Sequence, residues 1–81
     1  MTEQRKNILA DVGKHLSASR KSAGFSRSKA SKLLNISEHT LYSYEKGRRE
    51  FDVAIGLDMA KLYNVTFEKL TNYKKIAEAL I

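Results

Sequence analysis

The 81-residue sequence contains no cysteine, no proline and no tryptophan. It also has no signal-peptide pattern at its N-terminus and no apolar run long enough to cross a bilayer. Together these absences predict a soluble protein of a reducing compartment, with the cytoplasm as the expected location and no membrane partner. Because no linker-like or low-complexity segment interrupts the chain, we expect a single domain over residues 1–81.

Features typical of an enzyme are also missing. A chain of this length has little room for a deep catalytic pocket. Its histidines, His15 and His39, are far apart in the sequence, and neither sits in a nucleophile or metal-ligand pattern. No glycine-rich phosphate loop is present. We therefore expect no enzymatic activity, no metal, no cofactor and no small-molecule substrate.

Positive charge is abundant and unevenly distributed. The formal net charge is +6, and residues 14–49 contain nine basic and only two acidic side chains. Residues 50–81 contain four basic and five acidic side chains, and residues 1–13 are balanced. Such a block predicts a polyanion as partner, bound through counterion release and electrostatic steering. A solvated basic surface that keeps the protein soluble is the alternative.

Apolar residues recur at helical spacing along the whole chain, and no stretch alternates like a strand. We predict an all-α fold of five helices. The first begins between Thr2 and Asn7 and ends at Ala23, two short helices lie within residues 26–47, the fourth covers residues 53–63, and Thr66 caps the last. Gly56, inside the fourth helix, indicates close packing.

Residues 26–47 have the layout of a DNA-reading helix-turn-helix. Ser26 and Ser37 can each cap a short helix, and Asn35 between them tolerates the left-handed conformation that ends a helix. Apolar side chains on one side of this pair are expected in the core: Ala30, Leu33, Leu34, Ile36, Leu41 and Tyr44. The other side of the second helix carries groups that can hydrogen-bond base edges or phosphates: Glu38, His39, Tyr42, Ser43 and Lys46.

In its order of residues, the chain resembles the lambda-repressor-like (Cro/CI, XRE-type) helix-turn-helix family. The matching residues are Gly24-Phe25-Ser26, Ala30, Leu33, Ile36-Ser37, Thr40-Leu41, Tyr44-Glu45-Lys46-Gly47, Leu57, Ala60-Lys61-Leu62, Val65 and Phe67 to Leu70. The resemblance covers residues 13–70 and leaves residues 71–81 as a helical extension. It implies a compact five-helix domain in which the second and third helices form the helix-turn-helix.

The resemblance also implies roles for individual residues. Base-reading positions correspond to Glu38, His39, Tyr42 and Ser43. Phosphate-binding positions correspond to Ser26, Arg27, Ser37, Lys46, Arg48 and Arg49. Arg20 and Glu45 correspond to a pair that ties the first helix to the end of the third, and Phe25, Leu41, Tyr44 and Leu57 are assigned to the core.

Some of these residues have other interpretations. Glu38 also favours the helix macrodipole. Tyr42 could instead bind a phosphate through its hydroxyl or pack on a neighbouring helix. Arg20 and Glu45 could be independent surface charges.

The function that the resemblance implies is a sequence-specific transcriptional regulator whose partner is double-stranded DNA. We expect a repressor that binds a pseudo-palindromic operator as a homodimer, with the recognition helix in the major groove. Two alternatives are an antitoxin-like or adaptor-like interaction module and the DNA-binding part of a longer ligand-sensing regulator. The apolar end of the chain, Ala79-Leu80-Ile81, is compatible with the latter.

An apolar stripe in the extension suggests how a dimer could form. Leu70, Tyr73, Ala77 and Leu80 follow alternating steps of three and four residues, and Ile76 flanks them. If the core is complete by residue 70, this stripe must be covered by a second copy or by the Ile8 to Val12 face of the first helix. We favour the contact between two copies.

Overall fold

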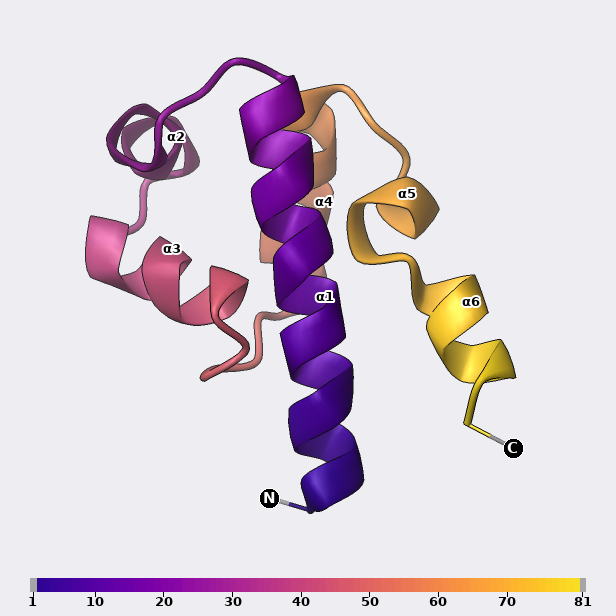
Figure 1. Cartoon of the computed structure of the whole chain (residues 1–81). Helices are drawn as coiled ribbons and strands as arrows, with labels where there is room; N and C mark the ends of the chain where they lie inside the picture. Colours follow the sequence, from indigo (N-terminus) through magenta and orange to yellow (C-terminus); the bar gives the residue numbers. More distant parts are fainter. Residues whose placement is uncertain (1, 81) are drawn as a thin grey trace.

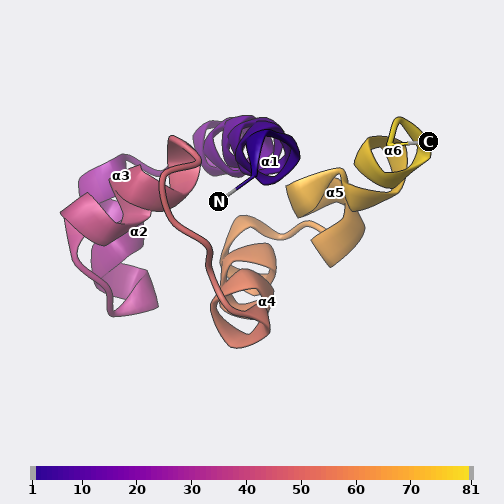
Figure 2. The same ribbon diagram turned by 90° about the horizontal axis from the view of Figure 1, so that it is seen from below.

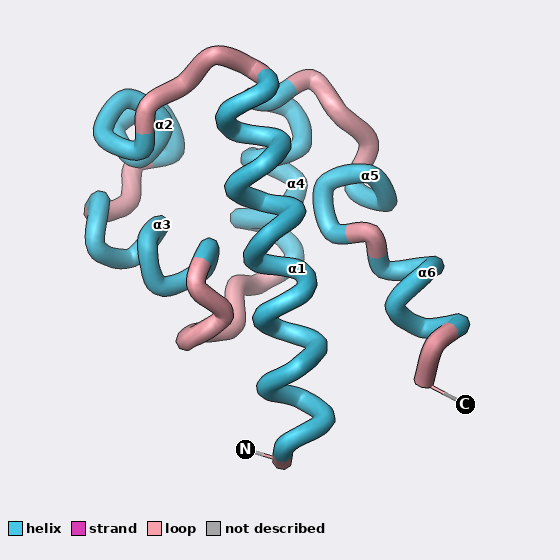
Figure 3. Tube along the Cα trace, viewed as in Figure 1, coloured by secondary structure: helices cyan, strands magenta, loops and turns pink. Residues whose placement is uncertain are grey.

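The computed structural model describes residues 2–80, and every regular element in that range is a helix. These helices are α1 (Glu3–Ser22), α2 (Arg27–Leu34), α3 (Glu38–Glu45), α4 (Val53–Tyr63), α5 (Phe67–Thr71) and α6 (Tyr73–Glu78) (Figures 1 and 3). The predicted all-α fold is confirmed. Met1 and Ile81, with which the predicted domain begins and ends, lie outside the described residues.

Most helix boundaries follow from local capping. The side chains of Thr2, Ser26, Ser37, Asp52 and Thr66 each accept a hydrogen bond from the backbone N–H three residues later. Asn35 and Asn64 end α2 and α4 with φ of 57° and 58°, and Gly24 and Gly47 have φ of 86° and 70° after α1 and α3. The predicted boundaries of the first four helices are therefore confirmed.

The prediction of a single last helix is wrong, because Asn72 divides it. Asn72 adopts φ of 59°, which ends α5, and α6 begins at the next residue. The Thr71 hydroxyl reinforces the break. It donates a hydrogen bond to the Phe67 carbonyl at 2.9 Å and accepts one from the Tyr73 amide N–H at 3.3 Å. A continuous apolar seam along residues 70–80 is consequently interrupted after Leu70.

Helix α1 is the longest element and lies between two groups of helices. Figures 1 and 2 show α2 and α3 on one side of it, α5 and α6 on the other, and α4 behind. The largest fully buried side chains are Leu16, Leu41, Met59 and Leu70. Leu70 thus completes the core and cannot belong to a surface stripe.

Two leucines that we predicted in the core are exposed. Leu33 is 52% and Leu57 is 53% exposed. On α2, Ala30 and Leu34 are the apolar residues that face the interior, and on α4 Met59 and Ala60 do so. Consecutive helical residues point about 100° apart, so Leu33 next to Leu34 is directed toward solvent.

Gly13, Gly47 and Gly56 each allow a close approach between segments, and Gly47 lies against the backbone of Leu9 and Ala10 in α1. A Cβ on Gly56 would lie 2.6 Å from Phe67 Cε1 and 3.1 Å from Phe51 Cε2, so the predicted close packing is confirmed. A Cβ on Gly13 of α1 would collide with the Glu45 carbonyl oxygen and would lie 2.9 Å from that of Tyr44. The end of α3 therefore rests directly on the backbone of α1.

Candidate nucleic-acid interface

Helices α2 and α3 are joined by a short turn and held by two serine caps. Ser26 Oγ accepts a hydrogen bond from the Lys29 amide at 3.1 Å, and Ser37 Oγ accepts one from the Thr40 amide at 2.9 Å. The first turn of α2 contains no acidic side chain, and its first residue is Arg27. The positive end of this helix is therefore free of a neutralising carboxylate in its own first turn.

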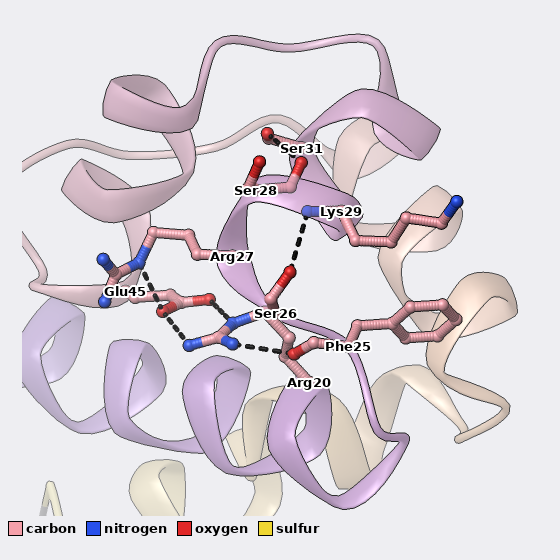
Figure 4. Close-up of polar contacts among 8 residues, drawn as sticks. All are labelled: Arg20, Phe25, Ser26, Arg27, Ser28, Lys29, Ser31 and Glu45. Carbon is pink, nitrogen blue, oxygen red and sulfur yellow. Dashed lines mark hydrogen bonds and ion pairs between the residues drawn. The ribbon is translucent and has the colours of Figure 1, made fainter.

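A buried ion pair fixes α3 against α1. Arg20 Nε donates to Glu45 Oε2 at 2.7 Å, and Arg20 Nη2 donates to Glu45 Oε1 at 3.1 Å (Figure 4). The third guanidinium nitrogen, Nη1, donates to the Phe25 carbonyl at 2.9 Å. Arg20 and Glu45 are only 4% and 5% exposed, so they are not independent surface charges. The hydrogen bond to Glu45 raises the pKa of Arg20.

The phenol of Tyr63 is also buried. Its hydroxyl makes no hydrogen bond to any of residues 2–80. Burial, with a smaller contribution from the negative charge of Glu45, raises the pKa of Tyr63 to about 12, although Arg20 opposes the shift. The resemblance pointed to Arg20 and Glu45, but nothing in the sequence pattern identified Tyr63.

The ring of Tyr42 on α3 brings the predicted contact residues together. Arg27 Cζ lies 4.9 Å from the ring centroid, and Lys46 Nζ and Arg48 Cζ each lie 5.6 Å from it. The His39 ring stacks beside it with the centroids 6.5 Å apart. Arg27 Nε also lies 3.5 Å from Glu45 Oε1, which connects this cluster to the buried ion pair. Three predicted phosphate ligands therefore converge on one predicted base reader.

Other predicted contact residues are placed as follows. Glu38 and His39 are exposed on α3, and Ser43 is half-buried on the same helix. Arg49 stands apart from the Tyr42 cluster, with Cζ 5.8 Å from the Tyr44 ring. The roles of these residues in reading bases or binding phosphates stay predictions.

Three residues of the predicted dimer stripe, Tyr73, Ile76 and Leu80, line two hollows on the surface. Ile76 and Leu80 line one of them with Ile8 of α1, so the stripe partly packs back on the first helix. Tyr73 lines the other, and its ring lies 6.2 Å from that of Phe67. Tyr73, Ala77 and Leu80 remain exposed and Ile76 is half-buried, so a contact between two copies stays a prediction.

A cleft of about 470 Å³ lies between α1 and the adjoining ends of α2 and α3. It is lined by Ala10, Lys14, Ser17, Ala18, Lys21, Arg27, Glu45 and Lys46. The residues that α1 contributes to this cleft have no role predicted from the sequence. Their spacing could have identified this face, because Lys14, Ala18 and Lys21 are spaced to lie on one side of a helix.

Two kinds of site are not found within residues 2–80. No three His, Asp or Glu side chains of this range are grouped in a way that could hold a metal ion. None of the helices described combines the length and apolarity that a membrane span requires.

Comparison with known proteins gives one family and one fold. The helix-turn-helix family matches residues 16–70. The crystal structure of the restriction-modification controller protein C.AhdI from Aeromonas hydrophila superposes with a TM-score of 0.72. The superposition covers 76% of this chain and 94% of that one, with 21% sequence identity, so this likeness concerns the fold. No curated protein matches the sequence.

Proposed function

Since this chain belongs to the helix-turn-helix family of XRE-type DNA-binding transcription regulators, we propose that it is a non-enzymatic repressor that binds a pseudo-palindromic operator as a homodimer. Helix α3 lies in the major groove of each half-site. The observation that carries the proposal is the convergence of Arg27, Lys46 and Arg48 around an α3 surface that exposes Glu38 and His39.

Phosphate contacts would set the position of the protein on the duplex. Arg27 begins α2, whose free backbone N–H groups favour a phosphate, and Lys46 and Arg48 follow the end of α3. Ser26 and Ser37 lie at the two helix starts, and Arg49 adds a further charge. Because Arg27, Lys46 and Arg48 lie around one aromatic ring, they can bind one segment of the phosphate backbone beside the groove that α3 enters.

Base contacts would then provide the sequence preference. Glu38 can accept a hydrogen bond from a cytosine amino group, and His39 can donate to guanine N7 or O6. Ser43 can hydrogen-bond several base edges, and the ring of Tyr42 can pack on a thymine methyl.

Homodimer formation would explain how so small a domain gains affinity for an operator. Two copies place their α3 helices on successive major-groove faces about 34 Å apart. The exposed side chains of the extension support such a contact: Tyr73, Ala77 and Leu80, with Ile76 beside them.

Selection from a random DNA pool tests the proposal directly. We expect a pseudo-palindromic motif, and affinity that falls steeply as salt rises. His39→Ala and Ser43→Ala should each cost about 1–3 kcal/mol on the selected site and much less on random duplex. Arg48→Ala should weaken both duplexes alike. A pool without enrichment, together with binding that ignores salt, would refute the proposal.

A further inference from the structure

The cleft between α1 and the ends of α2 and α3 is positively charged on both walls. Lys14 and Lys21 come from α1, Arg27 from α2, and Lys46 from the end of α3. Glu45, the one carboxylate in the lining, is already neutralised because it forms the bidentate pair with Arg20. Four cations therefore face a common space with no free negative charge among its lining residues.

The α1 wall of the cleft is also open. Between Lys14 and Lys21 this face carries only the small side chains of Ser17 and Ala18, and Ala10 continues it toward the N-terminus. Among residues 2–80, neither Lys14 nor Lys21 forms an ion pair. Their ammonium groups are free to bind a ligand, and the serine hydroxyl adds a neutral donor.

The cleft is continuous with the α3 surface. Arg27 and Lys46 line the cleft and also flank the Tyr42 ring. A duplex whose major groove receives α3 must carry its phosphate backbone past these two residues. The backbone segment next to α3 is thereby brought toward the α1 row, which consists of Lys14, Ser17 and Lys21.

We propose that this cleft is a second phosphate-binding site, in which Lys14, Ser17 and Lys21 bind the DNA backbone beside the base pairs that α3 reads. The inference rests on the proposed function and adds α1 to the DNA-binding surface. Each phosphate neutralised releases counterions, so each lysine contributes to the salt dependence of binding.

The test compares two double variants that remove the same charge from different faces. Lys14→Gln/Lys21→Gln removes the α1 row, and Lys69→Gln/Lys75→Gln removes two exposed lysines of α5 and α6. Glutamine preserves helix propensity, and circular dichroism verifies folding. Affinity is measured at several salt concentrations on the selected operator, with and without flanking base pairs.

For the α1 variant we expect the slope of log affinity against log salt to fall by about 1.8 units. Its affinity should drop at least tenfold at low salt, and flanking base pairs should strengthen binding by the parent but not by this variant. The α5–α6 variant should keep the parent slope within about half a unit. Ala18→Glu, which places a carboxylate in the cleft, should weaken binding more than Ala54→Glu on α4.

Three results would overturn the inference. Equal losses in the two double variants would mean that only net charge matters, and an unchanged slope for the α1 variant would mean that the row does not touch DNA. Inorganic triphosphate bound by the parent but not by the α1 variant, with equal DNA affinities, would assign the cleft to a small anion. In all three cases the parent still binds its operator, whereas a parent that binds no DNA refutes the proposed function as well.

Discussion

Among single residues, Tyr42 has the most partners in the interface, because its ring is close to three cations and to His39. A cation over an aromatic face is worth about 0.5–1 kcal/mol at an exposed site. The three like charges repel one another, and the ring offsets part of that repulsion. Tyr42 can therefore arrange the proposed phosphate ligands as well as touch a base.

Replacing Tyr42 separates its possible roles. Tyr42→Phe keeps the ring, so affinity for random duplex should stay within about twofold, whereas Tyr42→Leu should lose several-fold on random duplex and more on the selected duplex. Competition binding on both duplexes measures this. A loss confined to the selected site would indicate contact with a thymine methyl. Equal losses for Phe and Leu would indicate that the hydroxyl binds a phosphate.

Tyr63 predicts a specific weakness in alkali. Its pKa is about 12 in the folded chain against 10.0 for a free phenol, so the unfolded state loses the proton first. Tyr63 does not lower the free energy of unfolding below pH 10. As the pH rises from 10 through 12, ionisation of Tyr63 lowers that free energy by about 3 kcal/mol in total. Urea unfolding should show a shallower loss for Tyr63→Phe, with parent-like stability at pH 7. Identical pH profiles would contradict this.

Arg20 and Glu45 should behave as one unit in unfolding experiments. Arg20→Ala leaves a buried carboxylate without its partner and should cost about 3–5 kcal/mol, and adding Glu45→Gln should restore part of that loss. Lys74→Ala, which breaks the exposed pair with Glu68, is the control and should change stability little. Additive effects of the two buried substitutions would contradict the coupling.

At the level of elements, the crossing of α1 and α3 at Gly13 determines where α3 lies relative to α1. The groups that a Cβ would meet are backbone carbonyls of Tyr44 and Glu45, which cannot rotate away. At Gly56 the corresponding groups are ring atoms of Phe67 and Phe51, which can shift. The two glycines thus differ in how much the neighbouring structure can yield.

Alanine substitutions test this difference. Both changes improve helix propensity by about 1 kcal/mol, and overpacking opposes them by about 1–3 kcal/mol. We expect Gly13→Ala to lower the urea midpoint and to weaken DNA binding by displacing the end of α3. Gly56→Ala should lower the midpoint less and leave DNA binding close to that of the parent. The reverse order would show that the α1–α3 contact is the more adaptable one.

At the level of the whole molecule, the exposed apolar residues lie on two faces. Leu33, Val53 and Leu57 are exposed on α2 and α4, and Tyr73 and Leu80 are exposed at the C-terminal end. The division of the last helix at Asn72 leaves α6 in contact with α1 and shortens the stripe that we assigned to the dimer. The stripe that we propose for the dimer is therefore limited to residues beyond α5.

Sedimentation of matched variants identifies the face used. We expect the parent to dimerise at tens of micromolar, and Leu80→Asp and Tyr73→Ala to be monomeric, because both remove apolar area from the contact. Leu57→Asp places a similar charge on α4 and should remain dimeric. If Leu57→Asp dissociates the dimer and Leu80→Asp does not, the interface lies on α4. A parent that stays monomeric with and without DNA would assign the stripe to packing within one chain.

The sequence by itself determined the features that depend on neighbouring residues. A cap such as Ser37 acts within one helical turn, and a left-handed residue such as Asn35 ends a helix by its own conformation, so both are readable from the chain. The helix end at Asn72 was not predicted from the sequence, because apolar residues continue at helical spacing on both sides of it. The positive block was likewise visible in composition, and Arg20 with Glu45 followed from the resemblance.

Only the tertiary structure decided which side of each helix faces inward. Spacing shows that α2 and α4 have apolar faces, but packing against neighbouring helices selected Leu34 and Met59 for the interior and left Leu33 and Leu57 in solvent. In the same way, Lys14 and Lys21 line a cleft with Arg27 because α1 crosses α3 where Gly13 permits it. Contacts between residues distant in the chain depend on the packing of whole elements, which local patterns do not encode.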